Sequence, residues 1–96
     1  MKITTADKRW RDEVIKKYGK FCAYCFSTSN LNVHHIFSRR LKSTRHAVEN
    51  GIVLCAKHHI FSTEFSPHQT PTRFTLWIIQ KRKKTWYNKL EKKARI

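Results

Sequence analysis

Two short segments of this chain each place a pair of soft metal ligands three residues apart. Cys22 and Cys25 form the first pair, Cys55 and His58 form the second, and 29 residues separate the two pairs. Each pair can present both ligands on one face of a tight turn, and four such ligands close a tetrahedral zinc site. A site with no open position is structural, and its metal binding is coupled to folding. The spacing therefore predicts one structural Zn²⁺ that ties the two segments together.

A chain of this length needs such a staple. With 96 residues it buries only a modest fraction of its unfolded surface, so the core alone gives little stability. A disulfide framework is a poorer interpretation, because the three cysteines are odd in number and we expect a reducing compartment. The alternative to zinc is that the cysteines are small buried residues and His58 is an ordinary surface residue.

The strongly basic composition indicates a polyanionic partner. The chain has 21 Lys and Arg residues against 6 Asp and Glu residues, a formal charge of +15 at pH 7 that exceeds what solubility requires. Nucleic acid is the leading candidate, and an anionic membrane surface is the second. No apolar run is long enough for a membrane span or a signal peptide, so we expect a cytoplasmic protein without a membrane partner.

The N-terminal residues, 1–20, predict a helix that covers the core. Thr4 can cap this helix with Asp7 three residues later, and Gly19 supplies a stop. Apolar side chains recur every four residues between these positions, at Ala6, Trp10, Val14 and Tyr18. The pattern is typical of an amphipathic helix with one buried face.

The middle of the chain predicts two strands and a short helix. Apolar and polar residues alternate in residues 31–36, and Asn50-Gly51 precedes a second apolar run at residues 52–55. A basic loop, residues 37–49, joins these runs, so we expect a hairpin. A short helix from Ala56 to about Phe65 follows.

Residues 70–96 predict a strongly basic helical segment. Thr70 and Pro71 suit the N-cap and the first helical position, and a break is expected near residues 80–84. The apolar stripe of this segment consists of Phe74, Trp77, Ile78, Trp86, Leu90 and Ala94. We expect this stripe to pack on the core, and Trp86 and Tyr87 to be core residues rather than platforms for stacked bases.

Two histidine doublets accompany the predicted zinc ligands. His34 and His35 lie in the first strand, while His59 follows the zinc ligand His58 and must point elsewhere. Cys-x2-Cys, the strand LNVHHI, Asn50 before an apolar strand and Cys-x2-His-His occur in this order, and the pattern resembles the HNH endonuclease family. The spacing is also similar, with 15 residues from His35 to Asn50 and nine from Asn50 to His59.

The resemblance, which covers about residues 20–62, implies a ββα-metal unit in which a hairpin and a helix hold one divalent ion against the scissile phosphate. We therefore expect one α+β domain over residues 1–96. Its HNH core, residues 21–65, would be stapled by the structural zinc and flanked by the N-terminal helix and the basic C-terminal segment.

The resemblance also implies a role for each matching residue in a metal-dependent DNA endonuclease. His35 would be the general base that activates water, His34 and His59 would bind the catalytic ion, and Asn50 would aim His35 by bridging backbone groups. Cleavage would leave 5′-phosphate and 3′-hydroxyl ends. Exchanged roles within either doublet stay open, because strand alternation guarantees only that neighbours face opposite sides.

The sequence departs from the common family pattern in three places. An aspartate often stands where this chain has His34, a fourth cysteine where it has His58, and a glycine where it has Phe26. With two imidazoles and no carboxylate, the catalytic site should accept Mn²⁺, Co²⁺, Ni²⁺ or Zn²⁺ as readily as Mg²⁺. His46 and His68 match no family position, so we expect solvated loop residues there.

The basic side chains are expected to hold DNA through its phosphate backbone, without reading sequence. The candidates are Arg39, Arg40 and Arg45 in the loop, and Lys83, Lys84, Lys92 and Lys93 in the C-terminal segment. Short proteins of this type are often encoded by phages or prophages, which makes DNA-packaging proteins candidate partners. A monomer should nick DNA, whereas a dimer could cut both strands.

Two other functions fit the same residues. A non-catalytic zinc-stapled DNA-binding module would keep the zinc ligands and the basic surface but would have no use for His35 or His59. A nuclease of the same type could also act on RNA or on branched DNA.

Overall fold

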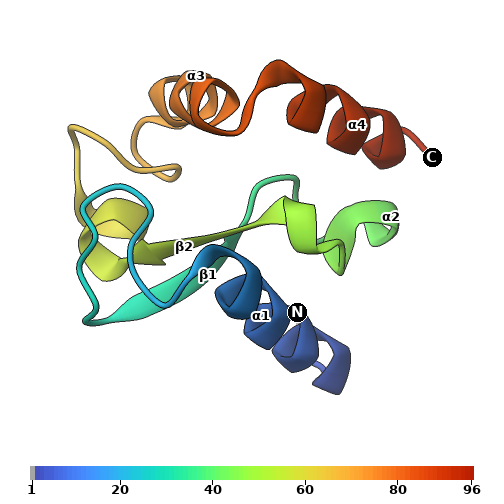
Figure 1. Cartoon of the computed structure of the whole chain (residues 1–96), viewed down its shortest axis with the longest axis horizontal. Helices are drawn as coiled ribbons and strands as arrows, with labels where there is room; N and C mark the ends of the chain where they lie inside the picture. Colours follow the sequence, from blue (N-terminus) through green and yellow to red (C-terminus); the bar gives the residue numbers. More distant parts are fainter. Residues whose placement is uncertain (1) are drawn as a thin grey trace.

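In this computed structural model, which describes residues 2–96, a two-stranded antiparallel sheet lies between α1 on one side and α3 with α4 on the other (Figure 1). The elements in chain order are α1 (Thr5–Tyr18), β1 (Leu31–His35), α2 (Lys42–Arg45), the 3-10 helix η1 (Val48–Asn50), β2 (Gly51–Cys55), the π-helix η2 (Lys57–Phe61), α3 (Pro71–Arg82) and α4 (Lys84–Ala94). The fold is α+β, as predicted. No helix in the described part of the chain is both long enough and apolar enough to cross a membrane.

Helix α1 begins with the capping box that the sequence predicts. The Thr4 hydroxyl accepts a hydrogen bond from the Asp7 amide at 3.1 Å, and the Asp7 carboxylate accepts one from the Thr4 amide at 2.8 Å. The helix stops before Gly19, whose φ of 100° suits glycine far better than other residues. Trp10 is buried as expected, but Ala6 is exposed and its neighbour Asp7 is buried. A charged residue therefore occupies part of the predicted apolar face.

Strands β1 and β2 form the predicted antiparallel pair. Their register puts Leu31 opposite Cys55 and His34 opposite Ile52. Neighbours along a strand point to opposite faces, so His34 and His35 lie on different sides of the sheet. Strand β1 is half-buried throughout, whereas every residue of β2 is buried. The second strand is thus covered on both faces.

One face of the sheet packs against α1. Val53 forms a buried cluster with Trp10 and Val14, and Gly51 lies close to the same helix. A Cβ atom at Gly51 would lie 2.4 Å from Val14 Cγ2 and 2.9 Å from Trp10 Cζ2. A larger residue would therefore push α1 away, which explains the glycine at the start of β2.

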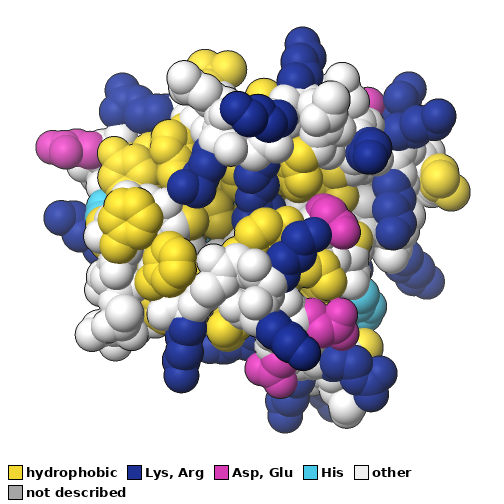
Figure 2. Space-filling model, viewed as in Figure 1, with side chains coloured by type: hydrophobic (Ala, Val, Ile, Leu, Met, Phe, Trp, Pro, Cys, Tyr) yellow, Lys and Arg dark blue, Asp and Glu magenta, His cyan; other side chains and the backbone are white. Residues whose placement is uncertain are grey.

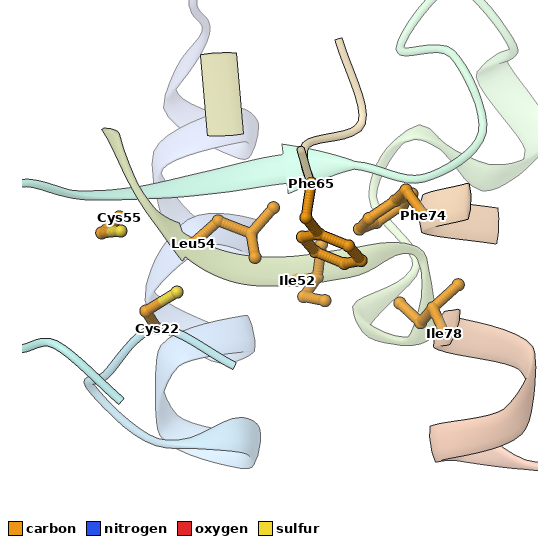
Figure 3. Close-up of a cluster of buried hydrophobic side chains, with 7 residues drawn as sticks. All are labelled: Cys22, Ile52, Leu54, Cys55, Phe65, Phe74 and Ile78. Atoms are coloured by element: carbon orange, nitrogen blue, oxygen red, sulfur yellow. The ribbon is translucent and has the colours of Figure 1, made fainter. Parts of the chain in front are cut away.

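The opposite face holds the larger buried cluster. Its members are Cys22, Ile52, Leu54, Cys55, Phe65, Phe74 and Ile78 (Figure 3). Ile52 and Leu54 come from β2, and Phe74 and Ile78 come from successive turns of α3. The two cysteines lie at one end of the cluster, so two of the predicted zinc ligands sit against apolar side chains (Figure 3).

Two predicted segments differ in the structure. The expected loop, residues 37–49, contains the single helical turn α2 and most of η1. The helix expected over residues 56–65 is only the five-residue η2, because Ser62 leaves it with extended backbone and accepts a hydrogen bond from the Phe65 amide at 3.1 Å. This turn lets the Phe65 ring enter the core, where it stacks on Tyr24 at 3.8 Å between ring centroids.

The predicted break in the C-terminal segment is confirmed at Lys83, which has a φ of 80° and separates α3 from α4. Pro71 opens α3 as predicted, but Thr70 makes no capping bond, because its hydroxyl accepts from the Ser66 amide at 2.9 Å. Of the predicted stripe, Phe74, Ile78 and Leu90 are buried, while Trp77 and Trp86 are partly buried against the larger cluster. The Trp86 indole also donates to the Glu49 carbonyl at 3.0 Å.

Candidate metal centre and active site

The four predicted zinc ligands lie close together. Their ligand atoms are all within 4.8 Å of one another in the cysteine cluster, which comprises Cys22, Cys25, Cys55 and His58. The Sγ atom of Cys55 lies 3.7 Å from Cys25 Sγ and 3.3 Å from His58 Nδ1. Thiolates bound to one zinc at about 2.3 Å lie about 3.8 Å apart at the tetrahedral angle, whereas a disulfide needs about 2.05 Å. The cluster can therefore hold a metal ion such as zinc, and its three cysteines are free thiols.

The turn that carries the first two ligands is built around the Cys22 sulfur. The Phe26 amide donates to the Cys22 carbonyl at 2.8 Å, and Phe26 takes a left-handed φ of 67°, a conformation that glycine adopts more easily. Burial raises the pKa of the Cys22 thiol, but backbone hydrogen bonds from Cys25, Cys55 and Tyr24 outweigh it and lower that pKa below its ordinary value. These hydrogen bonds favour the thiolate of Cys22, the form that binds metal, whereas burial raises the pKa of the Cys25 thiol.

The two neighbouring histidines of η2 belong to different clusters. His58 is part of the cysteine cluster, whereas His59 Nε2 lies 3.2 Å from His34 Nδ1 and 3.2 Å from His68 Nε2. We call His34, His59 and His68 the histidine cluster. Nitrogens bound to one cation at about 2.1 Å lie about 3.0–3.4 Å apart in octahedral or tetrahedral geometry. The spacing in the histidine cluster suits one bound cation.

The surroundings of His34 and His59 favour the neutral form of both imidazoles. The pKa of His34 is lowered to about 3, mainly by burial and to a smaller extent by the neighbouring His59, His68 and His35. Burial is also the main reason why the pKa of His59 is lowered. Neutral imidazoles keep the lone pair that a metal ion needs. Among the described residues, the buried Nδ1 of His59 has no hydrogen-bond partner.

His68 is an exposed loop residue, as expected, but its ring also contacts His59 and His34, which the sequence did not predict. A set of hydrogen bonds around the buried Ser66 shapes its loop: the Ser66 hydroxyl donates to the Ser62 carbonyl at 2.9 Å and accepts from the Gln69 amide at 3.0 Å. Thr70 adds a bond from its hydroxyl to the Ser66 carbonyl at 3.0 Å. The serine and threonine flanking His68 were the available signal, because such side chains fix tight turns.

His35 lies outside the histidine cluster, on the α1 side of the sheet. Its ring stacks on Trp10 with centroids 3.9 Å apart, and its Nε2 lies 3.0 Å from the Arg45 carbonyl oxygen. A carbonyl only accepts hydrogen bonds, so Nε2 carries the proton and the neutral ring keeps a lone pair on Nδ1. Burial is the largest effect on this ring and lowers the pKa of His35. The arrangement gives a neutral imidazole in one tautomer.

Asn50 bridges the backbone on both sides of the segment before β2. Its side chain is fully buried; Oδ1 accepts from the Phe37 amide at 2.7 Å, while Nδ2 donates to the carbonyls of Phe37 and Thr44 at 3.1 and 3.0 Å. The amide therefore makes the backbone bridge that the sequence predicts. Because Thr44 precedes Arg45, this bridge also helps to hold the carbonyl that contacts His35.

The histidine cluster and His35 line one open hollow of about 400 Å³. Its walls are Val33, His34, His35, Ser38, Arg39, His59 and His68. Arg39 also borders a second hollow of about 240 Å³ beside Trp10 and His35. The first hollow therefore brings together the histidine cluster, His35 and one arginine side chain.

One prediction about the basic loop needs correction. Arg45 was expected to bind phosphate, but its guanidinium donates to Asp7 Oδ1 at 2.9 Å and to Asp7 Oδ2 at 2.6 Å, so it is engaged inside the protein. His46 is exposed, as expected, although its Nε2 also lies 2.8 Å from the same carboxylate. Arg45 turns inward because Asp7 is buried and needs positive partners.

The remaining basic candidates stay on the surface. Arg40, Lys83, Lys84, Lys92 and Lys93 are exposed, whereas Arg39 is partly exposed and forms an ion pair with Asp7 at 3.5 Å. Lys and Arg side chains are spread over the face shown in Figure 2, with few acidic side chains among them. Such a surface suits the backbone of a nucleic acid.

Comparison with protein families, with curated proteins and with solved structures finds no match to this chain. Its function is therefore inferred from the residues and the geometry of the site.

Proposed function

We propose that this protein is a metal-dependent DNA endonuclease of the HNH type, with a zinc-stapled ββα-metal core. The observation that carries the proposal is the meeting of three imidazole nitrogens, 3.2 Å apart in successive pairs, beside a fourth imidazole in one open hollow. The β1–β2 pair and η2 supply His34, His35 and His59, in keeping with the family resemblance of residues 20–62.

The histidine cluster would hold a divalent ion, which would stabilise negative charge on the phosphate and on the leaving 3′ oxygen. Imidazole donors suit borderline ions such as Mn²⁺, Co²⁺, Ni²⁺ and Zn²⁺ better than Mg²⁺, which prefers oxygen. The third imidazole, His68, strengthens this preference. The cysteine cluster would hold a structural zinc, because its four protein ligands leave no open position.

His35 is the general base of the proposed reaction. With the Nε2 proton directed at the Arg45 carbonyl, Nδ1 takes a proton from a water molecule in the hollow. The water oxygen attacks phosphorus, the bond to the 3′ oxygen breaks, and that oxygen takes a proton from solvent. The products are a 5′-phosphate and a 3′-hydroxyl. Asn50 supports this step by holding the backbone next to Arg45.

A plasmid-relaxation assay across Mg²⁺, Mn²⁺, Co²⁺, Ni²⁺ and Zn²⁺ tests the proposal. We expect nicking by the parent protein, ends that DNA ligase reseals, and a loss of about 10² to 10⁴ fold in His35→Ala, the usual contribution of a general base. His35→Ala cutting at the parent rate would contradict the mechanism. A parent that binds plasmid but cuts it with none of these ions would favour the non-catalytic DNA-binding module. Branched DNA and RNA in the same assay distinguish the substrate classes.

A further inference from the structure

Helix α1 supports the proposed active site from outside the ββα unit. The ring of His35 has two fixed neighbours, the Trp10 indole face and the Arg45 carbonyl. The stack, with an interplanar angle of 13°, sets the plane of the ring. The hydrogen bond sets its rotation within that plane and places the proton on Nε2.

The Arg45 carbonyl belongs to a weak element. Helix α2 is a single turn of four residues, and no side chain caps its N-terminus. One turn of helix has little stability of its own, so contacts from elsewhere must hold this carbonyl in place. Asn50 holds one side through the Thr44 carbonyl at 3.0 Å.

Asp7 holds the Arg45 end of α2 through the Arg45 side chain. Two nitrogens of the Arg45 guanidinium donate to its two carboxylate oxygens, an arrangement that fixes orientation as well as distance. Asp7 is 6% exposed, and the capping box with Thr4 ties it to the first turn of α1. The Arg45 hydrogen bond is also the largest reason why the pKa of Asp7 lies far below its ordinary value.

Trp10 comes from the same face of α1, three residues after Asp7. It is 3% exposed, and its indole nitrogen donates to the Ala47 carbonyl at 2.7 Å, two residues beyond Arg45. One helix face therefore contacts His35 directly through Trp10 and indirectly through Asp7 and Arg45.

We propose that Asp7 and Trp10 are positioning residues for His35, which makes α1 part of the nuclease site rather than only a flanking helix. This inference rests on the proposed function of His35. A small displacement of a general base can lower the rate about 10²-fold while leaving substrate binding intact. Asp7 should therefore affect the chemical step more than the affinity for DNA.

Asp7→Asn is the main test, because it preserves size but weakens the pair with Arg45. In single-turnover cleavage we expect the rate at saturating DNA to fall about 10 to 100 fold, while the half-saturating DNA concentration changes less than about twofold. Thr4→Ala is the matched control, because it breaks the other half of the capping box without touching Arg45. Zinc content and circular dichroism are measured for both. Cleavage by Asp7→Asn at the Thr4→Ala rate would overturn the proposal.

A second variant and a second measurement keep the test independent of folding and of activity. If Asp7→Asn fails to fold, Arg45→Lys retains the positive charge but cannot donate through two planar nitrogens, and a folded Arg45→Lys that cuts at the parent rate overturns the proposal. Nitrogen-15 spectra should show His35 protonated on Nε2 in the parent and a mixture of tautomers in Asp7→Asn. An unchanged spectrum counts against positioning, whereas a parent that cuts nothing counts against the nuclease itself.

Discussion

The cysteine cluster and the histidine cluster share η2 but are built in opposite ways. The first takes its ligands as two pairs, each three residues apart, and places Cys22 and Cys55 within the hydrophobic core. The second takes one ligand each from β1, η2 and the loop before α3, and it borders an open hollow. A set of four protein ligands anchored in the core suits a structural zinc, whereas an open set suits exchange of water and substrate.

The largest effect is expected in the doublet His58-His59, whose two members belong to different clusters. His58→Ala should lose zinc and fail to fold stably, because binding a structural zinc contributes on the order of 10 kcal/mol to folding. His58→Cys is the control, since four thiolates also form a structural zinc site and should retain metal and fold. Metal analysis and circular dichroism measure the outcome. A folded, zinc-free His58→Ala would remove the distinction between the clusters.

His59→Ala, one residue along, should leave zinc content and fold unchanged. It removes the nitrogen that both other histidines approach, so we expect the divalent-ion concentration for half-maximal cleavage to rise by about 10 to 100 fold. His68→Ala should act in the same direction but less, because His68 is the exposed member of the cluster. His34→Asp is a useful counterpart, since its carboxylate should move the preference toward Mg²⁺. Equal ion requirements in all four proteins would exclude a shared ion.

The difference between the clusters also explains what could be predicted from the sequence. Ligands three residues apart constrain their own geometry, so local spacing alone is enough to predict the cysteine cluster. The alternation of β1 required His34 and His35 to separate, but only the packing of α1 and η2 decides which member meets His59. His68 was missed because its place depends on Ser66 being buried beneath the loop.

The helical segments show the same contrast between features set by local residues and features set by tertiary packing. The capping box of α1 and the break between α3 and α4 were predictable from local residues. The short η2 was not, because tertiary packing of Phe65 on Tyr24 ends the helical run early. The inward turn of Arg45 also depends on the burial of Asp7, a residue that local pattern marks only as a helix cap.

Neither metal-binding cluster contains a residue of α1, so α1 is held by other contacts. The ion pair between Asp7 and Arg45 should therefore contribute measurably to stability. Asp7→Asn should lower the melting temperature by roughly 5–15 °C, the size expected for removing a charged hydrogen bond from a domain of about 100 residues. The pKa of Asp7 is depressed, so its contribution is complete above the unfolded-state value of about 3.9 and declines only below it. The deficit should therefore be constant from pH 8 to about pH 5.

The neighbours of Asp7 set the conditions of that measurement. Arg45, Arg39, His46 and Thr4 face its carboxylate, and the contact with His46 is an ion pair only when that imidazole is protonated. The comparison is therefore made in a His46→Ala background, with zinc present throughout. A deficit that shrinks steadily between pH 8 and pH 5 in that background would show that the Asp7 carboxylate is not held ionised.

The smallest effect should come from a surface that belongs to neither cluster. Reversing Lys92 and Lys93 to glutamate should weaken DNA binding and lower the slope of log affinity against log salt by about two units, one unit for each phosphate that the protein no longer neutralises. Lys16 and Lys20, also exposed but near the end of α1, give a control with the same change in net charge. Lys83 is left in place because its φ of 80° shapes the break before α4.

Binding titrations at several salt concentrations decide the result, and equal slopes in both double variants would mean that overall charge, rather than α4, holds the nucleic acid. Because neither lysine belongs to a metal-binding cluster, the ion preference of cleavage should be identical to that of the parent in both variants.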